Sequence, residues 1–207
     1  MKNILLTATL ILALLAGSGC RGPKLAVADA QMSRGEYYDA AQTYRRIYNK
    51  LTKPSERTQR GEVAFRLGEA HRMLNQYTRA AAAYQNAIRY GYPEPIAQLH
   101  LAQMLHADGK YIPAARAYEE YLMQVPGSVE AQNGLDGAVL AQYLKAHPTR
   151  YVVKNAKLFN SRRADFAPQF SGSDILYYTT TNEKVTGTQR SEITGMKRSD
   201  IWMAKKR

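Results

Sequence analysis

The 207-residue sequence is poor in cysteine, in acidic residues and in long apolar runs. Its single cysteine, Cys20, excludes a disulfide bond within the chain. The apolar run from Ile4 to Ala16 is shorter than the roughly 20 residues that a membrane-spanning helix needs. The hydrophobic content of 45% is typical of a globular protein and argues against a wholly disordered chain.

The shortage of acidic residues leaves 17 Asp and Glu against 29 Lys and Arg, a formal net charge of +12. Such a balance favours acidic partners such as nucleic acid, anionic lipid or an acidic protein surface. The basic residues are scattered, however, and the sequence has no helix-turn-helix, zinc finger or aromatic RNA-binding strand motif. We interpret the charge as a solvated basic surface and expect no nucleic-acid partner.

The sequence also lacks the motifs of catalysis and of metal binding. It has no Ser/His/Asp order, no glycine-rich phosphate loop and no His-Glu-x-x-His. His100 and His106 are six residues apart, which places them on different faces of a helix, whereas metal-ligating pairs on a helix use spacings of three or four. We therefore expect no enzyme activity, no cofactor and no metal site.

The N-terminus has the layout of a secretory signal peptide. Lys2 precedes the apolar run, and the small residues 17–19 precede Cys20. The stretch LLAGSGC resembles the lipobox of bacterial lipoproteins, although Gly17 stands where leucine is usual. The resemblance implies a lipoprotein signal peptide over residues 1–19 and an acylated Cys20 that anchors the mature chain to a membrane. Plain secretion with cleavage nearby is the alternative.

An internal repeat follows, in three segments: GEYYDAAQTYRRI (35–47), NQYTRAAAAYQNAI (75–88) and GKYIPAARAYEEYL (109–122). Each has an alanine followed four residues later by a tyrosine, and these are Ala40 and Tyr44, Ala80 and Tyr84, and Ala114 and Tyr118. The 34 residues from Ala80 to Ala114 match the tetratricopeptide period. The 40 residues from Ala40 to Ala80 predict about six extra residues in a loop near residues 52–55. Asn75 and Gly109 are predicted to form the turns within the helix pairs.

Residues 20–148 are therefore predicted to form a tetratricopeptide-repeat α-solenoid of three repeats plus a capping helix. Neither helix of a pair can bury its apolar face alone, so stacking of the pairs stabilises each of them. The repeat alanines, Gly68 and Ala102 allow close approach, and the tyrosines fill the space between pairs. The last helix is predicted over about Val129 to Ala146, with Ser128 as its N-cap; its expected apolar face holds Leu135, Val139 and Leu144.

The candidate binding surface is the concave face formed by the first helix of each pair. Its predicted residues are Asp29, Met32, Phe65, Glu69, Arg72, Leu99, Gln103 and His106. This mixture suits an extended or helical peptide held by apolar contacts with a few polar anchors. It does not resemble the carboxylate clamp of chaperone-binding tetratricopeptide domains, because Leu25, Asp29 and Ile96 stand where that clamp needs basic or amide groups.

After Pro148 the pattern changes from helices to strands, predicted at Arg150–Leu158, Ile175–Thr181 and Asp200–Ala204. Asn160-Ser161, the segment DFAPQF (165–170) and the segment LYYT (176–179) resemble the opening blade of a WD40-like β-propeller, and SDIW (199–202) resembles a later strand of that blade. The predicted fold class is mainly α, with the solenoid followed over residues 149–207 by an incomplete WD40-like propeller segment.

Taken together, the lipobox, the repeats and PTRYVV (148–153) leading into the tail resemble the N-terminal part of the modular OmpA-family outer-membrane lipoproteins associated with type IX secretion and gliding motility. The resemblance implies a periplasm-facing, lipid-anchored scaffold of the outer membrane that binds a protein partner of an envelope or secretion complex. A later domain of that family binds peptidoglycan, so peptidoglycan is an expected partner only of a full-length member. We expect this chain to be a truncated product, a fragment or half of a split gene; the alternative is a natural β extension that folds back on the last helices.

Two other functions stay open at this point. One is a lipoprotein accessory of outer-membrane β-barrel assembly, which also uses tetratricopeptide repeats on a lipid anchor but has no reason to begin a propeller. The other is the N-terminal fragment of a propeller-containing sensor or enzyme.

Overall fold

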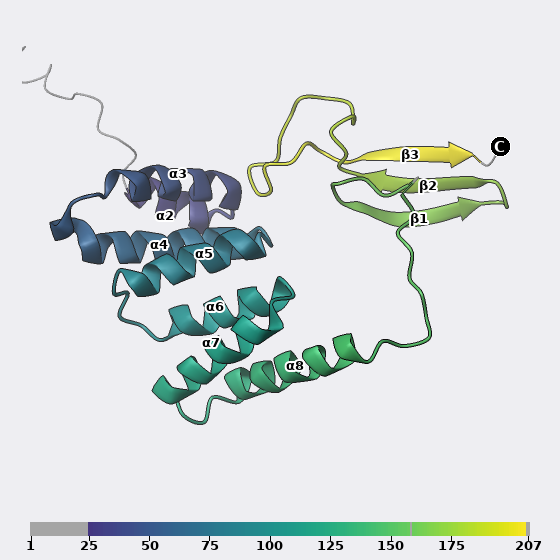
Figure 1. The fold of residues 1–207 in the computed structure, drawn as a ribbon. Coiled ribbons are helices and arrows are strands. Elements are labelled where there is room, and N and C mark those ends of the chain that lie inside the picture. Colours follow the sequence, from purple (N-terminus) through teal and green to yellow (C-terminus); the bar gives the residue numbers. More distant parts are fainter. Residues whose placement is uncertain (1–24, 158, 206–207) are drawn as a thin grey trace, which may run out of the picture.

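The computed structural model describes residues 25–157 and 159–205, which form a stack of helices followed by a small sheet (Figure 1). The helices are α2 (Leu25–Ser33), α3 (Tyr37–Lys50), α4 (Arg57–Met73), α5 (Tyr77–Arg89), α6 (Ile96–Ala107), α7 (Tyr111–Gln124) and α8 (Val129–Ala146), with a 3₁₀ turn η1 (Pro54–Glu56) before α4. The strands are β1 (Asp165–Ser171), β2 (Ile175–Thr180) and β3 (Asp200–Lys205). The predicted fold class is confirmed: the chain is mainly α, in a tetratricopeptide-like arrangement with a C-terminal antiparallel sheet.

Each helix pair is closed by the same turn. Gly35, Asn75 and Gly109 adopt positive φ angles of 77°, 53° and 74° at equivalent places in the three repeats. The residue after each of them donates its N–H to the carbonyl five residues earlier, at 2.9 Å in all three turns. This is the Schellman motif, which satisfies carbonyls left free at a helix end. The predicted turn positions Asn75 and Gly109 are confirmed, and the turn fixes the antiparallel geometry of each pair.

The repeat alanines and tyrosines form the core, as predicted. Ala40, Ala80 and Ala114 are fully buried, and the three repeat tyrosines are buried beside them. Gly68 on α4 is packed so closely that a Cβ there would lie 2.6 Å from the ring of Tyr84. The small residues therefore set the distance between helices, and the tyrosine rings occupy the space that this distance leaves.

The extra residues of the first repeat lie in a different place from the predicted one. The connectors before α4 and α6 both hold six residues, 51–56 and 90–95. Helix α4, however, has 17 residues against 12 in α6. The prediction of a longer loop near residues 52–55 is wrong, because the insertion lengthens α4 at its N-terminal end.

The added turn of α4 is held by aromatic contacts. The Arg60 guanidinium lies 4.7 Å from the ring centroid of Tyr48 and 4.6 Å from that of Tyr90. Arg57 donates from Nη2 to the carbonyl of Arg89 at 2.7 Å. Cation–π contacts contribute about 0.5–2 kcal/mol each, so the longer helix is stabilised by α3 on one side and by the end of α5 on the other.

Helix α8 has the predicted bounds, and its predicted N-cap is confirmed: the Ser128 hydroxyl accepts a hydrogen bond from the Ala131 N–H at 3.3 Å. Its predicted apolar face is partly wrong. Leu135 packs against the core, but Val139 and Leu144 are each 55% exposed, because Ala131 and Ala138 form the buried side instead. Helix α8 ends the described stack with apolar side chains on its outer face.

The tail forms a three-stranded antiparallel sheet in the order β1-β2-β3. Strands β2 and β3 correspond to two predicted strands, but the predicted strand at Arg150–Leu158 is wrong: residues 150–157 form no strand, and Leu158 lies outside the described residues. The first strand is instead β1, in which Pro168 is accommodated by an irregularity between Phe166 and Gln169. Proline lacks an N–H and is tolerated at the outer edge of a sheet or at a bulge.

The tail returns to the first helix pair rather than to the last helices (Figure 1). In the loop between β2 and β3, the carbonyls of Glu192 and Ile193 both accept from the Tyr38 N–H, at 3.2 Å each. Gly195 is buried, and a Cβ there would lie 2.1 Å from the Tyr38 ring. The contact depends on a glycine, because any side chain at this position would displace the loop from α3.

Candidate partner-binding surface

The first helices of successive pairs are joined by side-chain bonds. Asp29 on α2 pairs with Arg66 on α4, Glu69 on α4 pairs with His100 on α6, and Gln103 on α6 donates to Glu130 on α8. We call this surface the A-helix face, and its residues are Asp29, Met32, Phe65, Arg66, Glu69, Arg72, His100, Gln103, His106 and Glu130. The bonds make α2, α4, α6 and the start of α8 one continuous surface.

The bonds repeat because the residues repeat. Arg66 and His100 are 34 residues apart, the period of repeats two and three, while Asp29 and Glu69 are 40 apart, the spacing of repeats one and two. In both cases a carboxylate accepts from the basic residue of the following repeat. The same geometry therefore arises twice from equivalent sequence positions.

At the first of these sites, Asp29 is held by two donors. The Tyr44 hydroxyl donates to Oδ1 at 2.6 Å, and Arg66 donates from Nη1 to Oδ2 at 2.5 Å. Burial tends to raise the pKa of Asp29, but these two hydrogen bonds and the Arg66 charge outweigh it and lower that pKa. Both charged side chains remain about two-fifths exposed, beside a shallow hollow lined also by Met32 and Ser33.

At the second site, Glu69 is more enclosed and better satisfied. Its carboxylate accepts from the Tyr84 hydroxyl at 2.5 Å, from His100 Nδ1 at 2.6 Å and from Arg72 Nη2 at 2.6 Å. Burial would raise the pKa of Glu69, but the three hydrogen bonds dominate and lower it to about 2. Burial also raises the pKa of the Tyr84 hydroxyl, as does its bond to Glu69. Glu69 is thus ionised at neutral pH and ties α4 to both α5 and α6.

Aromatic rings close the middle of the A-helix face. Phe65 stacks on Tyr92 with centroids 4.3 Å apart and an interplanar angle of 8°, and it also faces His100 at 6.2 Å. His106 meets the edges of Tyr111 and Tyr118. These side chains position the surface, and their removal would disturb the stack as well as any contact with a partner.

The third site departs from the pattern. Gln103 stands where the first two repeats have a carboxylate, and its Nε2 donates to Glu130 Oε1 at 2.7 Å. A glycine, Gly134, lies on α8 where Arg66 and His100 lie on their helices, and the Tyr118 ring fills the space where a Cβ would be. The face therefore ends in a neutral amide rather than in a further ion pair.

Of the predicted site residues, Leu99 is misplaced. It is 2% exposed and belongs to the core cluster that α6, α7 and α8 share, because its position on α6 turns toward the next helices. The other seven lie half-buried on the A-helix face. Sequence reasoning missed Arg66, His100 and Glu130 as parts of this surface, although the recurrence of a basic or imidazole side chain at the repeat spacing was a signal for the first two. It also missed that the buried Tyr44 and Tyr84 donate to the carboxylates of the face.

Three further predictions concern metal ligands, membrane-spanning helices and the signal peptide. Among residues 25–157 and 159–205, no three His, Cys, Asp or Glu side chains come together as metal ligands would. Within those same ranges, none of the helices combines the length and the apolar character needed to cross a bilayer. Cys20 and the predicted signal peptide lie outside the described residues.

The geometry of the described helices defines the class: a tetratricopeptide-like helical repeat protein with a small appended sheet. No model of a known protein family matches the chain, and no curated protein matches it. Among solved structures, the chain is similar to the first tetratricopeptide domain of Spaghetti (RPAP3) bound to the HSP90 peptide SRMEEVD, with 19% sequence identity and a TM-score of 0.47. The match covers 61% of this chain and 99% of that one. The class assignment rests on the repeat geometry of this chain itself.

Proposed function

We propose that this protein is a non-enzymatic scaffold that binds a protein or peptide partner on the A-helix face. The observation that carries the proposal is the set of bonds between successive first helices, Asp29 to Arg66, Glu69 to His100 and Gln103 to Glu130. A surface whose side chains are fixed in this way loses little conformational entropy when a partner binds. It is a preorganised platform rather than a set of independent side chains.

The chemistry of the face favours a partner held by apolar contact with a few polar anchors. The carboxylates of Asp29 and Glu69 already accept hydrogen bonds from donors of the chain itself, so they have little capacity for a strongly basic ligand. Arg66 and Arg72 are likewise paired within the chain. The groups that remain open to a partner are therefore Met32 and the carbonyl oxygen of the Gln103 amide, whose nitrogen donates to Glu130. They lie on α2 and α6, toward opposite ends of the face.

The proposed setting is the periplasmic side of a bacterial outer membrane, with an acyl anchor at Cys20. The sequence LLAGSGC and the resemblance to modular OmpA-family lipoproteins support this part of the proposal. In that setting the partner is a component of an envelope or type IX secretion complex. Peptidoglycan attachment would belong to a full-length member of that family.

The test uses variants that change the surface while sparing the core. Met32→Lys and Gln103→Arg alter opposite ends of the A-helix face, and an arginine at 103 can still pair with Glu130. Gln85→Arg is the matched control, because Gln85 is exposed on α5, outside this face. Each variant is used to recover binding proteins from solubilised envelopes.

We expect Met32→Lys and Gln103→Arg to reduce recovery of the same protein, and Gln85→Arg to leave it at the wild-type level. Recovery at the wild-type level by all three variants, with unchanged circular dichroism, would contradict the assignment of partner binding to the A-helix face. Recovery of β-barrel assembly components in place of secretion components would favour the accessory function over the one proposed here.

A further inference from the structure

The outer face of α8 is divided into a polar and an apolar half. Gln132, Asn133 and Asp136 cover the N-terminal half, and the Gln132 amide donates to Asp136 along the helix surface. In the C-terminal half, four large side chains are more than half exposed: Val139, Leu140 and Leu144 at 55% and Tyr143 at 59%. We call these four residues the α8 patch.

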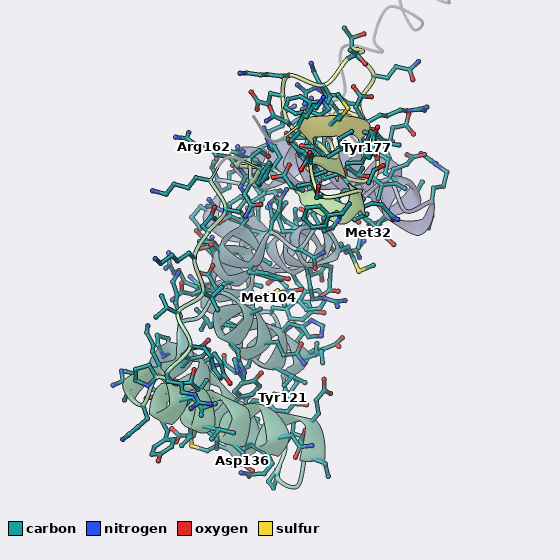
Figure 2. All side chains as sticks on the ribbon, turned by 90° about the vertical axis from the view of Figure 1, so that its right-hand side faces the viewer. Met32, Met104, Tyr121, Asp136, Arg162 and Tyr177 are labelled. Carbon is teal, nitrogen blue, oxygen red and sulfur yellow. The ribbon has the colours of Figure 1, made fainter. Side chains whose placement is uncertain are left out.

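Helical spacing places the α8 patch on the side opposite the core. Residues 139, 140, 143 and 144 lie within about two-fifths of a helical turn of each other, and Ala131 and Ala138 on the other side are fully buried. Helix α8 is also the last helix of the described stack, with Asp136 at the end of the molecule farthest from the sheet (Figure 2). Among the described residues, the ring of His147 stacks on Tyr143 with centroids 4.2 Å apart, and the four side chains otherwise stay more than half exposed.

The patch is complementary to itself when two copies of α8 run antiparallel. About a two-fold axis midway between residues 141 and 142, Leu140 of one copy lies opposite Tyr143 of the second, and Val139 and Leu144 flank this central pair on opposite sides. The four side chains thus add to one apolar contact. Such an isologous contact, in which one surface meets its own copy, is the usual basis of a two-fold dimer.

The charges beside the patch follow the same symmetry. The antiparallel register sets Asp136 of one copy opposite His147 of the second, at the end of α8, and the basic Arg150 follows just beyond it. His147 and Arg150 are both exposed in the single chain. A parallel pair would instead set Asp136 against Asp136 and Arg150 against Arg150, and like charges in that position repel.

Exposed valines extend the same complementarity. Val129, at the start of α8, is 72% exposed, and Val153, beyond its end, is 95% exposed. In the antiparallel register Val129 of one copy lies at the level where the second copy leaves α8, and Val153 belongs to the segment that follows. The apolar surface thus continues on both sides of the central patch.

We propose that the occupant of the α8 patch is α8 of a second copy of this chain, packed antiparallel in a two-fold dimer. The interface is smaller than the roughly 800 Å² per partner of a standard stable complex, so the dimer dissociates on dilution. The proposal is independent of the partner-binding function of the A-helix face, which includes Glu130 at the start of α8 but none of the four residues of the α8 patch.

Sedimentation velocity over a concentration series tests dimerisation, with the full chain carrying Cys20→Ser so that acylation does not contribute. The mean mass is expected to rise toward twice the monomer mass with concentration. Leu140→Glu is expected to abolish the rise, whereas Met123→Glu, at a 75% exposed site on α7, preserves it. A rise unaffected by Leu140→Glu, or no rise in the parent chain, would overturn the proposal.

Cysteine cross-linking in the Cys20→Ser background tests the antiparallel orientation. Leu140→Cys lies beside the two-fold axis and is expected to form an intermolecular disulfide. Val129→Cys is not, because two copies of residue 129 lie about 38 Å apart along the antiparallel helices at a rise of about 1.5 Å per residue. Efficient disulfide formation by Val129→Cys would indicate a parallel pair and contradict the proposed arrangement.

A charge exchange tests the same register without a cysteine. Asp136→Arg places like charges together and is expected to weaken the dimer at least several-fold. Adding His147→Glu and Arg150→Glu to that variant restores opposite charges and is expected to recover most of the affinity. Failure of the triple variant to recover, with its monomer still folded, would refute the pairing of residues 136 and 147.

Discussion

Replacement of Gly68 by alanine tests how the helix spacing is set. Gly68 lies inside α4, where alanine is favoured over glycine by about 1 kcal/mol in helix propensity. Propensity alone therefore predicts a more stable protein. The structure predicts the opposite, because the added Cβ would lie 2.6 Å, 2.7 Å and 3.0 Å from three ring atoms of Tyr84.

The Tyr84 ring cannot move aside easily. It is fully buried, and its hydroxyl is bound to Glu69 at 2.5 Å. Overpacking of a core of this kind costs about 1–3 kcal/mol. We expect the cost to exceed the propensity gain, so that Gly68→Ala lowers the free energy of unfolding by up to about 2 kcal/mol.

Gly61→Ala, in the same helix, is the matched control. A Cβ at Gly61 would meet its nearest neighbours, atoms of Tyr90 and Tyr92, at 3.4 Å, an ordinary contact distance. The propensity gain should therefore appear almost in full, and Gly61→Ala is expected to raise the free energy of unfolding by up to about 1 kcal/mol.

Urea unfolding followed by circular dichroism measures both variants, with the slope of the transition showing whether the unfolding remains comparable. The two substitutions should move the midpoint in opposite directions. If Gly68→Ala stabilises the protein as much as Gly61→Ala does, the close packing of α4 against Tyr84 is not what sets the helix spacing.

Three further predictions concern other parts of the molecule. Because the pKa of Glu69 is lowered to about 2, its stabilising contribution is present above about pH 4.5 and is lost as the pH falls toward 2. Glu69→Gln should reduce the difference in unfolding free energy between pH 4.5 and pH 2 by up to about 3 kcal/mol, as measured by denaturant titration at each pH. An unchanged difference would contradict the conclusion that Glu69 is ionised and hydrogen-bonded in the folded protein. Arg60→Ala should lower the free energy of unfolding by about 1 kcal/mol through loss of its contacts with two tyrosine rings, while Arg46→Ala, at an exposed site on α3, should stay within about 0.5 kcal/mol; equal effects would argue against the aromatic contacts. Cys20→Ser should abolish metabolic labelling by fatty acid, and persistent labelling would refute the lipobox interpretation.

The repeat architecture could be predicted from the sequence because its signals are local and recur. The alanine and tyrosine spacings identify the helices that pack together, and Asn75 and Gly109 mark turns that only a few residue types adopt easily. The position of the six extra residues could not be predicted in the same way. The change of repeat spacing gives the number of inserted residues but not their conformation. The inserted residues extend a helix because Arg60 contacts the rings of two tyrosines that are distant in the sequence.

The tail shows the limit of intrinsic strand preference. Residues 151–153 are rich in β-branched and aromatic side chains, yet they form no strand, because they pair with none of the described strands, although the outer edges of β1 and β3 are free. Residues 165–171 contain a proline and still form β1, since β2 offers such an edge and Pro168 lies at an irregularity of the pairing. Strand pairing is a property of the whole tail and is not visible in a short segment.

The residues of the candidate surface could likewise be predicted only in part. Projection of repeat positions placed Asp29 and Glu69 on the A-helix face, because equivalent positions recur there. It failed for Leu99, which the shared core of α6, α7 and α8 buries. The bonds between successive helices also lay beyond a position-by-position projection, because each joins side chains of two different repeats.

The central claim, that the A-helix face binds a protein partner, is tested most directly by photo-cross-linking of the full chain in the cells that produce it. A photoreactive amino acid is placed at Met32 or Gln103 on the A-helix face, and at Gln85 or Glu119 on exposed positions of α5 and α7. The account predicts that both A-helix positions cross-link the same protein and that the other two positions do not. Cross-linking of that protein from Gln85 or Glu119, with none from Met32 or Gln103, would contradict it.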